Sequence, residues 1–315
     1  DLLGEMNSSH MGFNTSGTEE QTALRYVSLE PGILYKDDQP FIVDRVLARS
    51  AADKKGIDIQ QGDELVAVNG KRLNPDMPRD YYFYRPAMEL ELLLTFKREG
   101  VEKEVKIHPG GSLSRNLYDE WIDENSDRVK SLSKDKIAYA HMKNMGGGEI
   151  NKFIMTMTRE LNGKEGLIVD LRYNPGGNVH DELIRFLQQR TYLQWKSRGG
   201  TLSNQSNFAP SDYPIVLLIN EQSLSDAEMT AAGFKELGLG TIIGTETYRW
   251  IIFTSSMRLV DGSSHRMPGW GCYTLDGRNL EQEGVGPDVY VKQTFVDRLQ
   301  GKDPQIEKAV EHILK

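Results

Sequence analysis

The sequence contains a single cysteine, Cys272, and this scarcity limits the chemistry that the chain can carry. One thiol cannot form an internal disulfide bond or a cysteine-rich zinc site, so we expect Cys272 to be a small buried side chain. We expect no metal and no other cofactor. The chain also lacks a run of about 18 apolar residues, the length that a membrane-spanning helix requires. The sequence therefore predicts no membrane span.

Positive charge is also in short supply. The 315 residues include 38 Lys and Arg against 46 Asp and Glu, a formal net charge of −8 at pH 7. This acidic balance disfavours nucleic acid as a partner, because lysine and arginine supply most of the affinity for phosphate backbones. The chain begins at Asp1 without a signal sequence, which we interpret as an N-terminal truncation. The compartment therefore stays open.

Short segments of alternating hydrophobicity, typical of strands, fill residues 26–109. The expected strands are Phe41–Val46, Glu64–Asn69, Leu90–Lys97 and Val101–Ile107. A short helix is expected over Ser50–Gly56, because small residues precede a glycine stop. The pattern predicts a compact β-rich domain.

Residues 110–315 instead alternate short apolar strands with amphipathic helices. The expected strands are Lys136–His141, Gly166–Arg172, Pro214–Ile219 and Gly240–Gly244, and the expected helices are Asn116–Leu132, Glu149–Leu161, Val179–Gln189, Ala227–Leu237 and Pro304–Leu314. Such alternation favours a mainly parallel sheet covered by helices on both faces. The polar stretch Gly199–Ser211 is interpreted as a surface loop. The predicted fold class is α/β.

Ser225 lies on a strand-to-helix turn, directly before the helix that begins at Ala227. A serine there can project its hydroxyl beyond the end of the strand, where the free N–H groups of the first helical turn also point. It can therefore act as a nucleophile beside part of an oxyanion hole. A second interpretation is an N-terminal cap, because Glu228 three residues later completes the capping-box pattern.

A second turn of this kind, Asn-Pro-Gly-Gly-Asn over 174–178, follows another predicted strand. Neighbouring parallel strands end at the same edge of a sheet, so the two turns can meet there. Glycine allows bare backbone N–H groups to approach a ligand. We expect Gly176 or Gly177 to pair with the N–H of Asp226 as an oxyanion hole.

A serine nucleophile needs a base within hydrogen-bond reach. The candidates are a lysine or one of the histidines His10, His141, His180 and His265. Lone histidines are more often structural or exposed than catalytic, and spacing does not choose among these. His10 also lies in a Ser-His-Met sequence that is a common cloning remnant.

Several short motifs in residues 50–70 recur in one protein family. They are Ser50-Ala51-Ala52 ahead of Gly56, Gly62-Asp63-Glu64-Leu65 and Val68-Asn69-Gly70. Together they closely resemble a PDZ domain, which captures extended peptide ends by adding a strand to a sheet edge. The resemblance implies that residues 26–109 bind the ends of peptides or unfolded proteins.

A longer series of motifs runs through residues 170–306. It comprises Asp170–Gly177, Asn220-Glu221, Ser225–Glu228, Gly238–Gly240, Ile243–Thr245, Leu259–Gly262, Gly284–Asp288 and Gly301–Ile306. The series resembles the tricorn-type and carboxyl-terminal processing serine peptidases. That resemblance implies a ClpP/crotonase-like core over 110–315, hydrolysis of peptides or protein tails without metal, and a homo-oligomer.

The two branches of this superfamily differ in their base. The processing peptidases use a lysine 25 residues after the nucleophile, which is Trp250 here and cannot accept a proton. The tricorn branch has a Ser-His pair ahead of its PDZ domain, and this chain has Ser9-His10 after Leu3-Gly4-Glu5. By this resemblance residues 1–25 are the tail of a helical core segment. It implies these roles: Ser225 nucleophile, His10 base, Ser9 its orienting partner, and Glu281 acidic member, with Glu283 as a weaker candidate.

One segment departs from the tricorn pattern. Where that family has Thr-Trp-Gly-Gly, this chain has Thr247-Tyr248-Arg249-Trp250, and two bulky side chains are expected to narrow the space near Ser225 or move a loop. Two alternatives stay open, and the first of them is motivated by this departure. The chain is then a weak or inactive peptide-binding protein on a peptidase scaffold, or a Ser-Lys processing peptidase whose lysine comes from elsewhere.

Overall fold

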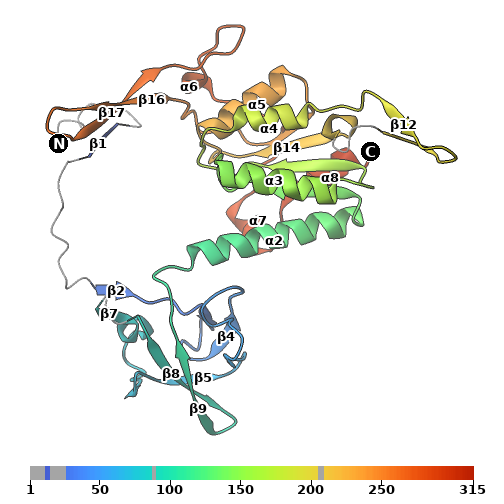
Figure 1. Ribbon diagram of the computed structural model, residues 1–315. Helices are drawn as coiled ribbons and strands as arrows, with labels where there is room; N and C mark the ends of the chain where they lie inside the picture. The colour runs from blue at the N-terminus through green and yellow to red at the C-terminus, as the bar shows by residue number, and fades with distance from the viewer. Residues whose placement is uncertain (1–10, 15–25, 87–89, 205–208) are drawn as a thin grey trace. The chain divides into compact units, whose positions relative to one another are not determined.

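The computed structural model describes residues 11–14, 26–86, 90–204 and 209–315. The chain forms two compact units, drawn in Figure 1. One unit comprises Thr18–Glu124, and the other combines Asp1–Gly17 with Asn125–Lys315. The first unit is therefore an insertion in the sequence of the second. The predicted helix end over Asp1–Asn7 lies outside the described residues.

The unit Thr18–Glu124 is built from short antiparallel strands. Its largest sheet has the order β6-β5-β8-β9, and two strand pairs, β3-β4 and β2-β7, complete it. The strands are β2 (Tyr26–Ser28), β3 (Ile33–Tyr35), β4 (Val43–Val46), β5 (Glu64–Val68), β6 (Lys71–Arg72), β7 (Tyr84–Pro86), β8 (Leu92–Arg98) and β9 (Val101–Ile107), with one 3₁₀ turn, η1 (Arg79–Tyr82). The β-rich prediction for this region is confirmed.

The short helix predicted over residues 50–56 was wrong. The segment forms successive turns, in which Asp53 N–H bonds to the Ser50 carbonyl at 3.3 Å. The carboxylate of Asp53 also accepts the N–H of Arg49 at 2.7 Å. An aspartate side chain that bonds to nearby backbone competes with helix formation, and the Asp53 carboxylate does so here.

The second unit is organised around a five-stranded parallel sheet. The strand order is β10 (Ile137–His141), β11 (Gly166–Asp170), β14 (Ile215–Ile219), β15 (Thr241–Gly244) and β18 (Val289–Tyr290). Every residue of β10, β11 and β14 is buried, as expected for strands covered on both faces. The mainly parallel α/β core is therefore confirmed.

Two hydrophobic clusters cover the two faces of this sheet (Figure 1). On one face pack α3 (Gly147–Glu160), α4 (His180–Leu187) and α5 (Asp226–Glu236). On the other pack the end of α2 (Ser114–Ser133) and α8 (Pro304–Ile313), through Val129, Ile306 and Val310. Two short helices, α6 (Leu280–Glu283) and α7 (Phe295–Leu299), lie in the connections near the C-terminus. No helix in the described ranges combines the length and apolar content needed to cross a bilayer.

A buried ionic cluster ties α8 to the sheet. Arg172 is fully buried, and its guanidinium donates to the Asp170 carboxylate at 2.7 Å and to the Asp303 carboxylate at 2.8 Å. Asp303 is the N-cap of α8, where its side chain accepts the N–H of Gln305 and Ile306. Burial alone raises the pKa of Asp170, but Arg172 and His141 outweigh it and hold that pKa below its usual range.

A three-stranded antiparallel sheet also belongs to this unit. Its order is β1 (Gly12–Asn14), β17 (Ser264–Trp270) and β16 (Phe253–Arg258). Gly12 pairs with Arg266, so the start of the described chain is fixed to a segment more than 250 residues away. This pairing places the N-terminal strand in the same unit as the parallel sheet.

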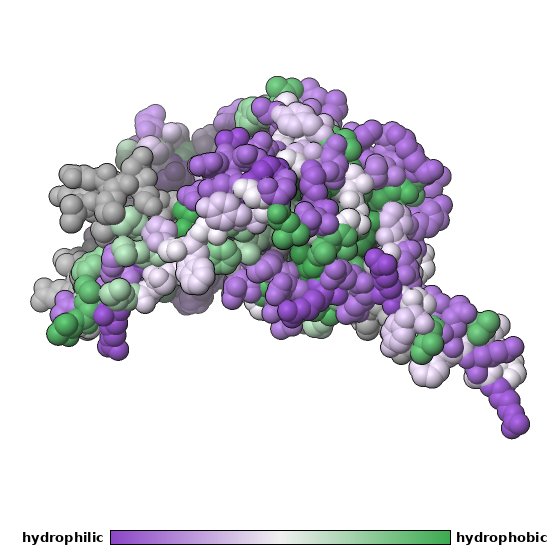
Figure 2. All heavy atoms as spheres, turned by 90° about the horizontal axis from the view of Figure 1, so that it is seen from above, coloured by the Kyte–Doolittle hydropathy of each residue, from purple (hydrophilic) through white to green (hydrophobic). Residues whose placement is uncertain are grey.

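The loop predicted over residues 199–211 was wrong in part. Leu202–Asn204 forms β13, which pairs with β12 (Gln194–Lys196) in a two-stranded hairpin. Figures 1 and 2 show this hairpin projecting from its unit, with hydrophobic residues among hydrophilic ones. Trp195 and Leu202 are 59% and 61% exposed, so a buried apolar face, the usual signal of a strand, is missing here.

Candidate active site

Ser225 lies between β14 and α5 in an unusual backbone conformation. Its φ is 52° and its ψ is −116°, a region that residues with a side chain rarely occupy. Such a conformation costs of order 1–3 kcal/mol and persists only where the surrounding structure holds it. The turn around Ser225 is therefore stabilised by its neighbours, and those neighbours define the site.

The second strand-to-helix turn packs directly against the first. The N–H of Leu224 donates to the carbonyl of Asn174 at 2.9 Å. A Cβ on Gly176 would lie 2.6 Å from the Cβ of Ser225 and 3.0 Å from the backbone nitrogen of Asp226. Only glycine permits this approach, and the φ of Gly176, 95°, also favours glycine.

The N–H groups of this turn are not equivalent. That of Gly176 donates to the side-chain oxygen of Asn174 at 2.9 Å. The carbonyl of Gly176 and the N–H of Asn178 both bond to the backbone of Met145, at 2.9 and 2.7 Å. Over the part of the chain that is described, the N–H groups of Gly177 and Asp226 have no hydrogen-bond acceptor. Two backbone donors beside Ser225 are therefore available to an external atom.

The side chain of Asp226 joins the starts of two helices. Its carboxylate accepts the N–H groups of Val179 and His180 at 2.7 and 3.0 Å, and Nδ1 of His180 lies 2.6 Å from it. Asp226 is the first residue of α5, and His180 is the first residue of α4. The carboxylate therefore fixes the distance between the Ser225 turn and the 174–178 turn.

Glu228 is the buried anchor of the Ser225 turn. Its carboxylate accepts the N–H groups of Ser225, Arg249 and Trp250 at 3.0, 2.8 and 2.7 Å. The hydroxyl of Thr247 adds a fourth bond at 2.5 Å. Burial raises the pKa of the Glu228 carboxyl, and these four donors act in the opposite direction. The capping-box pattern read from the sequence thus also ties the Thr247–Trp250 segment to the nucleophile turn.

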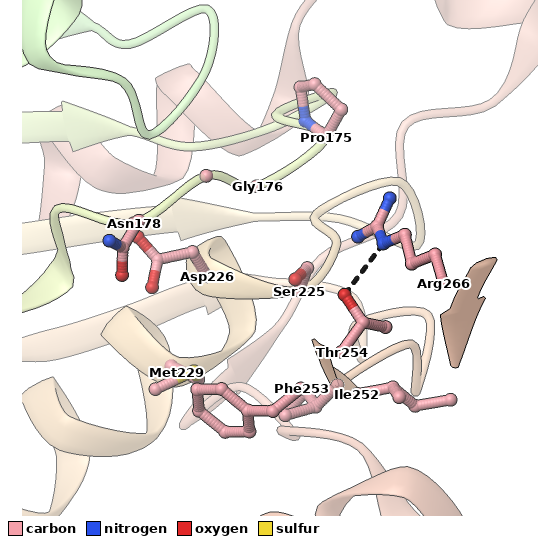
Figure 3. Close-up of a pocket in the computed structure, with 12 residues that line it drawn as sticks. Pro175, Gly176, Asn178, Ser225, Asp226, Met229, Ile252, Phe253, Thr254 and Arg266 are labelled. Atoms are coloured by element: carbon pink, nitrogen blue, oxygen red, sulfur yellow. Dashed lines mark hydrogen bonds between the residues drawn. The ribbon is translucent and has the colours of Figure 1, made fainter. Parts of the chain in front are cut away.

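A cavity of about 600 Å³ opens over Ser225 (Figure 3). One wall is formed by the backbone of the 175–178 turn and by Asp226, and a second wall is apolar. The apolar side chains are Met229, Ile251, Ile252 and Phe253. Thr254 and Arg266 complete the lining, and Figure 3 shows the hydrogen bond between them. The volume and the mixed lining are those of a small-ligand or peptide site.

The structure brings four of the predicted site residues together: Gly176, Gly177, Ser225 and Asp226 all line the cavity. Glu281 does not line it; it is an exposed residue of α6. Ser9 and His10 lie outside the described residues. Glu283 is exposed, with its carboxylate 3.7 Å from Arg278.

The other histidines raised from the sequence are not cavity residues. His141 is buried, 3.8 Å from Asp170. His180 bonds to Asp226, and His265 pairs with Phe13 and Met257 in the three-stranded sheet. The hairpin predicted around His265 is confirmed.

The bulky pair Arg249-Trp250 also does not line the cavity. Arg249 forms a salt bridge with Glu246 at 2.7 Å, and the Trp250 ring lies 5.6 Å from that of Tyr248. The apolar wall comes from the residues directly after this pair. The expected narrowing of the space near Ser225 by these two side chains is therefore not seen.

Sequence reasoning missed Arg266, Thr254 and the apolar wall 251–253. Only their neighbours were considered from the sequence: His265 beside Arg266, and the departure from the tricorn pattern at Thr247–Trp250 ahead of residues 251–253. The alternation of side chains along β16 and β17 was an available signal, since Thr254 and Arg266 lie on facing strands of that pair. Without the pairing partner, however, the side of the sheet that faces Ser225 could not be identified.

Comparisons with known proteins agree with this geometry. Residues 136–291 match the model of Peptidase family S41, and residues 2–75 match that of the PDZ domain. Tricorn protease of Thermoplasma acidophilum is 34% identical over 200 residues, which cover 63% of this chain and 18% of that protein. Tricorn protease homolog 1 of Streptomyces coelicolor is 28% identical over 325 residues, 98% of this chain and 30% of that protein. The crystal structure of the tricorn protease superposes with a TM-score of 0.79 at 25% identity, covering all of this chain and 32% of that one.

A PDZ domain and a parallel α/β core with a serine at the strand-to-helix turn define the class of PDZ-containing serine peptidases. Residues 136–291 belong to Peptidase family S41, and the relatives that the chain is similar to are of the tricorn and carboxyl-terminal processing types. The chain spans less than a third of the length of these tricorn relatives.

Proposed function

We propose that this chain hydrolyses peptide bonds in peptides or protein tails, with Ser225 as the nucleophile. The observation that carries the proposal is the position of Ser225 in a strained turn, beside two backbone N–H groups that have no acceptor in the described structure. Preorganised donors of this kind stabilise the oxyanion of an acyl-transfer intermediate. A serine that served only as a helix cap would not require the strain.

The oxyanion hole consists of the N–H groups of Gly177 and Asp226. Gly176 is the weaker candidate, because its N–H already donates to Asn174. Its role is to let the turn approach Ser225 closely. The negative charge that develops on the scissile carbonyl oxygen is then shared between two donors, each of which is worth about 3 kcal/mol in comparable enzymes.

His10 is proposed as the base that takes the proton of Ser225 and returns it to the leaving amine. The described structure supports this through β1, because Gly12 pairs with Arg266, and Arg266 lines the Ser225 cavity. His10 is two residues from Gly12, so its Cα can be at most about 7.2 Å from that anchored position. Ser9 and Glu281 complete the proposed constellation as orienting residues.

The PDZ domain is proposed to capture the ends of substrates. In the described residues β3 pairs only with β4, so one edge of β3 is open for an added strand. A peptide that binds there gains main-chain hydrogen bonds without regard to its sequence. Deleting residues 26–109 should therefore raise KM for long peptides and leave KM for short ones unchanged; equal cleavage of long substrates by both proteins would exclude capture.

Two observations bear on the alternatives. Arg249 and Trp250, which motivated an inactive binding protein, do not line the cavity. The described residues that do line it include no lysine, which disfavours a Ser-Lys pair.

The resemblance to tricorn also carries over a homo-oligomer as a proposal, and sedimentation of the chain at several concentrations tests it.

The decisive test is reaction of the chain with a fluorophosphonate probe, followed by mapping of the labelled residue. We expect labelling at Ser225 that disappears in Ser225→Ala and falls at least about 100-fold in His10→Ala, because the base supplies a factor of this size. His265→Ala is the matched control and should label normally. Labelling that persists in His10→Ala would exclude the histidine mechanism, and absence of labelling in the parent chain would favour a peptide-binding protein.

A further inference from the structure

Among the described residues that line the Ser225 cavity, two have ionisable side chains, Asp226 and Arg266. The carboxylate of Asp226 already accepts hydrogen bonds from the Val179 and His180 backbone and lies 2.6 Å from the His180 ring. Its hydrogen-bonding capacity is directed toward α4, away from any ligand. The charge that the cavity offers to a substrate is therefore the positive charge of Arg266.

The guanidinium of Arg266 is oriented but not neutralised. Its Nε donates to the Thr254 hydroxyl at 2.7 Å, and Figure 3 shows this bond at the edge of the cavity. In the described ranges no carboxylate forms a salt bridge with it. One bond from Nε holds the plane of the guanidinium and leaves the two terminal nitrogens, with four N–H donors, for a ligand.

The surroundings of Arg266 strengthen this reading. Arg266 lies on β17, the central strand of its sheet, where it pairs with Gly12 on one side and Ser256 on the other. Neither neighbour carries a charge. The apolar wall of Met229, Ile251, Ile252 and Phe253 adds no acceptor side chain to the cavity. Among the described lining residues, Asp226 is the only carboxylate, and its hydrogen bonds go to α4, so the partner that best suits this guanidinium is a carboxylate of the substrate.

We propose that Arg266 is a specificity-determining residue that binds a carboxylate of the peptide close to the scissile bond. The inference rests on the proposed peptidase function of Ser225. A guanidinium and a carboxylate are both planar, so they form two parallel charge-assisted hydrogen bonds, and lysine would not reproduce this geometry. The carboxylate comes from an acidic side chain of the substrate or from its free C-terminal end.

Binding to the full chain carrying Ser225→Ala tests this without any need for hydrolysis. Three fluorescent short peptides of one sequence distinguish the sources of the carboxylate: one with Glu and an amidated end, one with Gln and an amidated end, and one with Gln and a free end. Fluorescence anisotropy gives the Kd of each. We expect the best carboxylate peptide to bind at least about tenfold more tightly than the uncharged one, equivalent to about 1.4 kcal/mol.

The same titrations in Arg266→Gln isolate the contribution of this side chain. We expect the Glu peptide, the free-end peptide or both to bind Arg266→Gln no more tightly than the uncharged peptide does. The peptide whose advantage disappears carries the carboxylate that Arg266 binds. Any affinity that the PDZ domain itself adds for a free C-terminal end persists in Arg266→Gln. The titrations therefore separate it from the contribution of Arg266. Arg258→Gln, on the neighbouring strand β16 and outside the cavity lining, is the matched control and should keep the full preference.

Charge reversal provides an independent check. Arg266→Glu should bind a lysine-containing peptide more tightly than the glutamate peptide, an inversion that general loss of structure cannot produce. The proposal is overturned if the chain with Arg266 intact binds charged and uncharged peptides equally well. It is also overturned if the preference for a carboxylate survives unchanged in Arg266→Gln. Arg266-dependent binding in a chain whose Ser225 never reacts with fluorophosphonate would instead overturn the peptidase function and leave carboxylate recognition standing.

Discussion

Nδ1 of His180 lies 2.6 Å from the carboxylate of Asp226, and this contact links the first residues of helices α4 and α5. Asp226 has two functions in our proposal. Its backbone N–H faces the oxyanion, and its side chain fixes the distance to the turn that carries Gly177. A change in the Asp226 side chain should therefore displace its backbone N–H group from the oxyanion position.

Asp226→Ala should lower kcat by about 100-fold with little change in KM, because a displaced oxyanion donor acts in the transition state. Asp226→Asn should recover much of this loss, since the amide oxygen can still accept the N–H groups of Val179 and His180. Steady-state kinetics on one peptide gives both parameters. Equal kcat in Asp226→Ala and the parent chain would show that the side chain does not position the donor.

Glu228→Gln should destabilise the fold by roughly 2–3 kcal/mol, because the amide NH₂ of glutamine would face backbone N–H donors and leave at least one unsatisfied. The same change should slow fluorophosphonate labelling, since Glu228 also holds the N–H of Ser225. Urea unfolding and labelling rates check the two effects. Glu236→Gln, exposed at the end of α5, serves as control and should change neither.

Gly176→Ala should abolish labelling of Ser225. The new Cβ would lie 2.6 Å from the Cβ of Ser225, so the nucleophile turn must move. Gly163→Ala is a matched control: its φ of 78° imposes a similar backbone strain, but no heavy atom lies within 4 Å of the new Cβ. Labelling of Gly176→Ala at the rate of the control would contradict the proposed close packing of the two turns.

Asp170→Asn should lower the free energy of unfolding by about 3–5 kcal/mol, the typical effect of breaking a buried ion pair. Urea unfolding at neutral pH measures this. Asp276→Asn, which removes an exposed pair with Arg278, should change stability by less than about 1 kcal/mol. A loss no larger than in this control would mean that Arg172 is satisfied without Asp170.

The low pKa of Asp170 also predicts a pH dependence. Its pKa is lower in the folded than in the unfolded state, so the folded chain binds fewer protons. The stabilisation is therefore fully present above the ordinary aspartate pKa of about 3.9 and is lost as the pH falls below it. Acid unfolding of the parent chain should show this component, and Asp170→Asn should lack it.

Local patterns predicted four of the five strands of the central sheet and missed only the two-residue edge strand β18. The apolar run before Ser225 became β14, and the helix predicted from Ala227 begins one residue earlier, at Asp226. Strands β10, β11 and β14 are buried on both faces, so their hydrophobic pattern does not depend on knowing their neighbours. The two strand-to-helix turns followed from the same signal, because they are simply where such strands end.

The rest of the cavity depends on pairing between distant residues. β1 is three residues long with two exposed, and only its partner β17 makes it a strand. Arg266 faces the Ser225 cavity because of that sheet, so no pattern local to residue 266 could place it there. The hairpin β12–β13 was missed for a related reason: all six of its residues are exposed, so burial leaves no period of two in the sequence.

The pairing of Gly12 with Arg266 also sets the order in which the protein can mature. A ribosome releases the N-terminal strand first and its partner only after most of the chain, including the inserted PDZ-like unit, has been synthesised. Contacts of such long sequence separation form late in folding. The proposed peptidase site, which includes Arg266 and the strand that begins at Gly12, therefore requires nearly the whole span between these residues to have been synthesised.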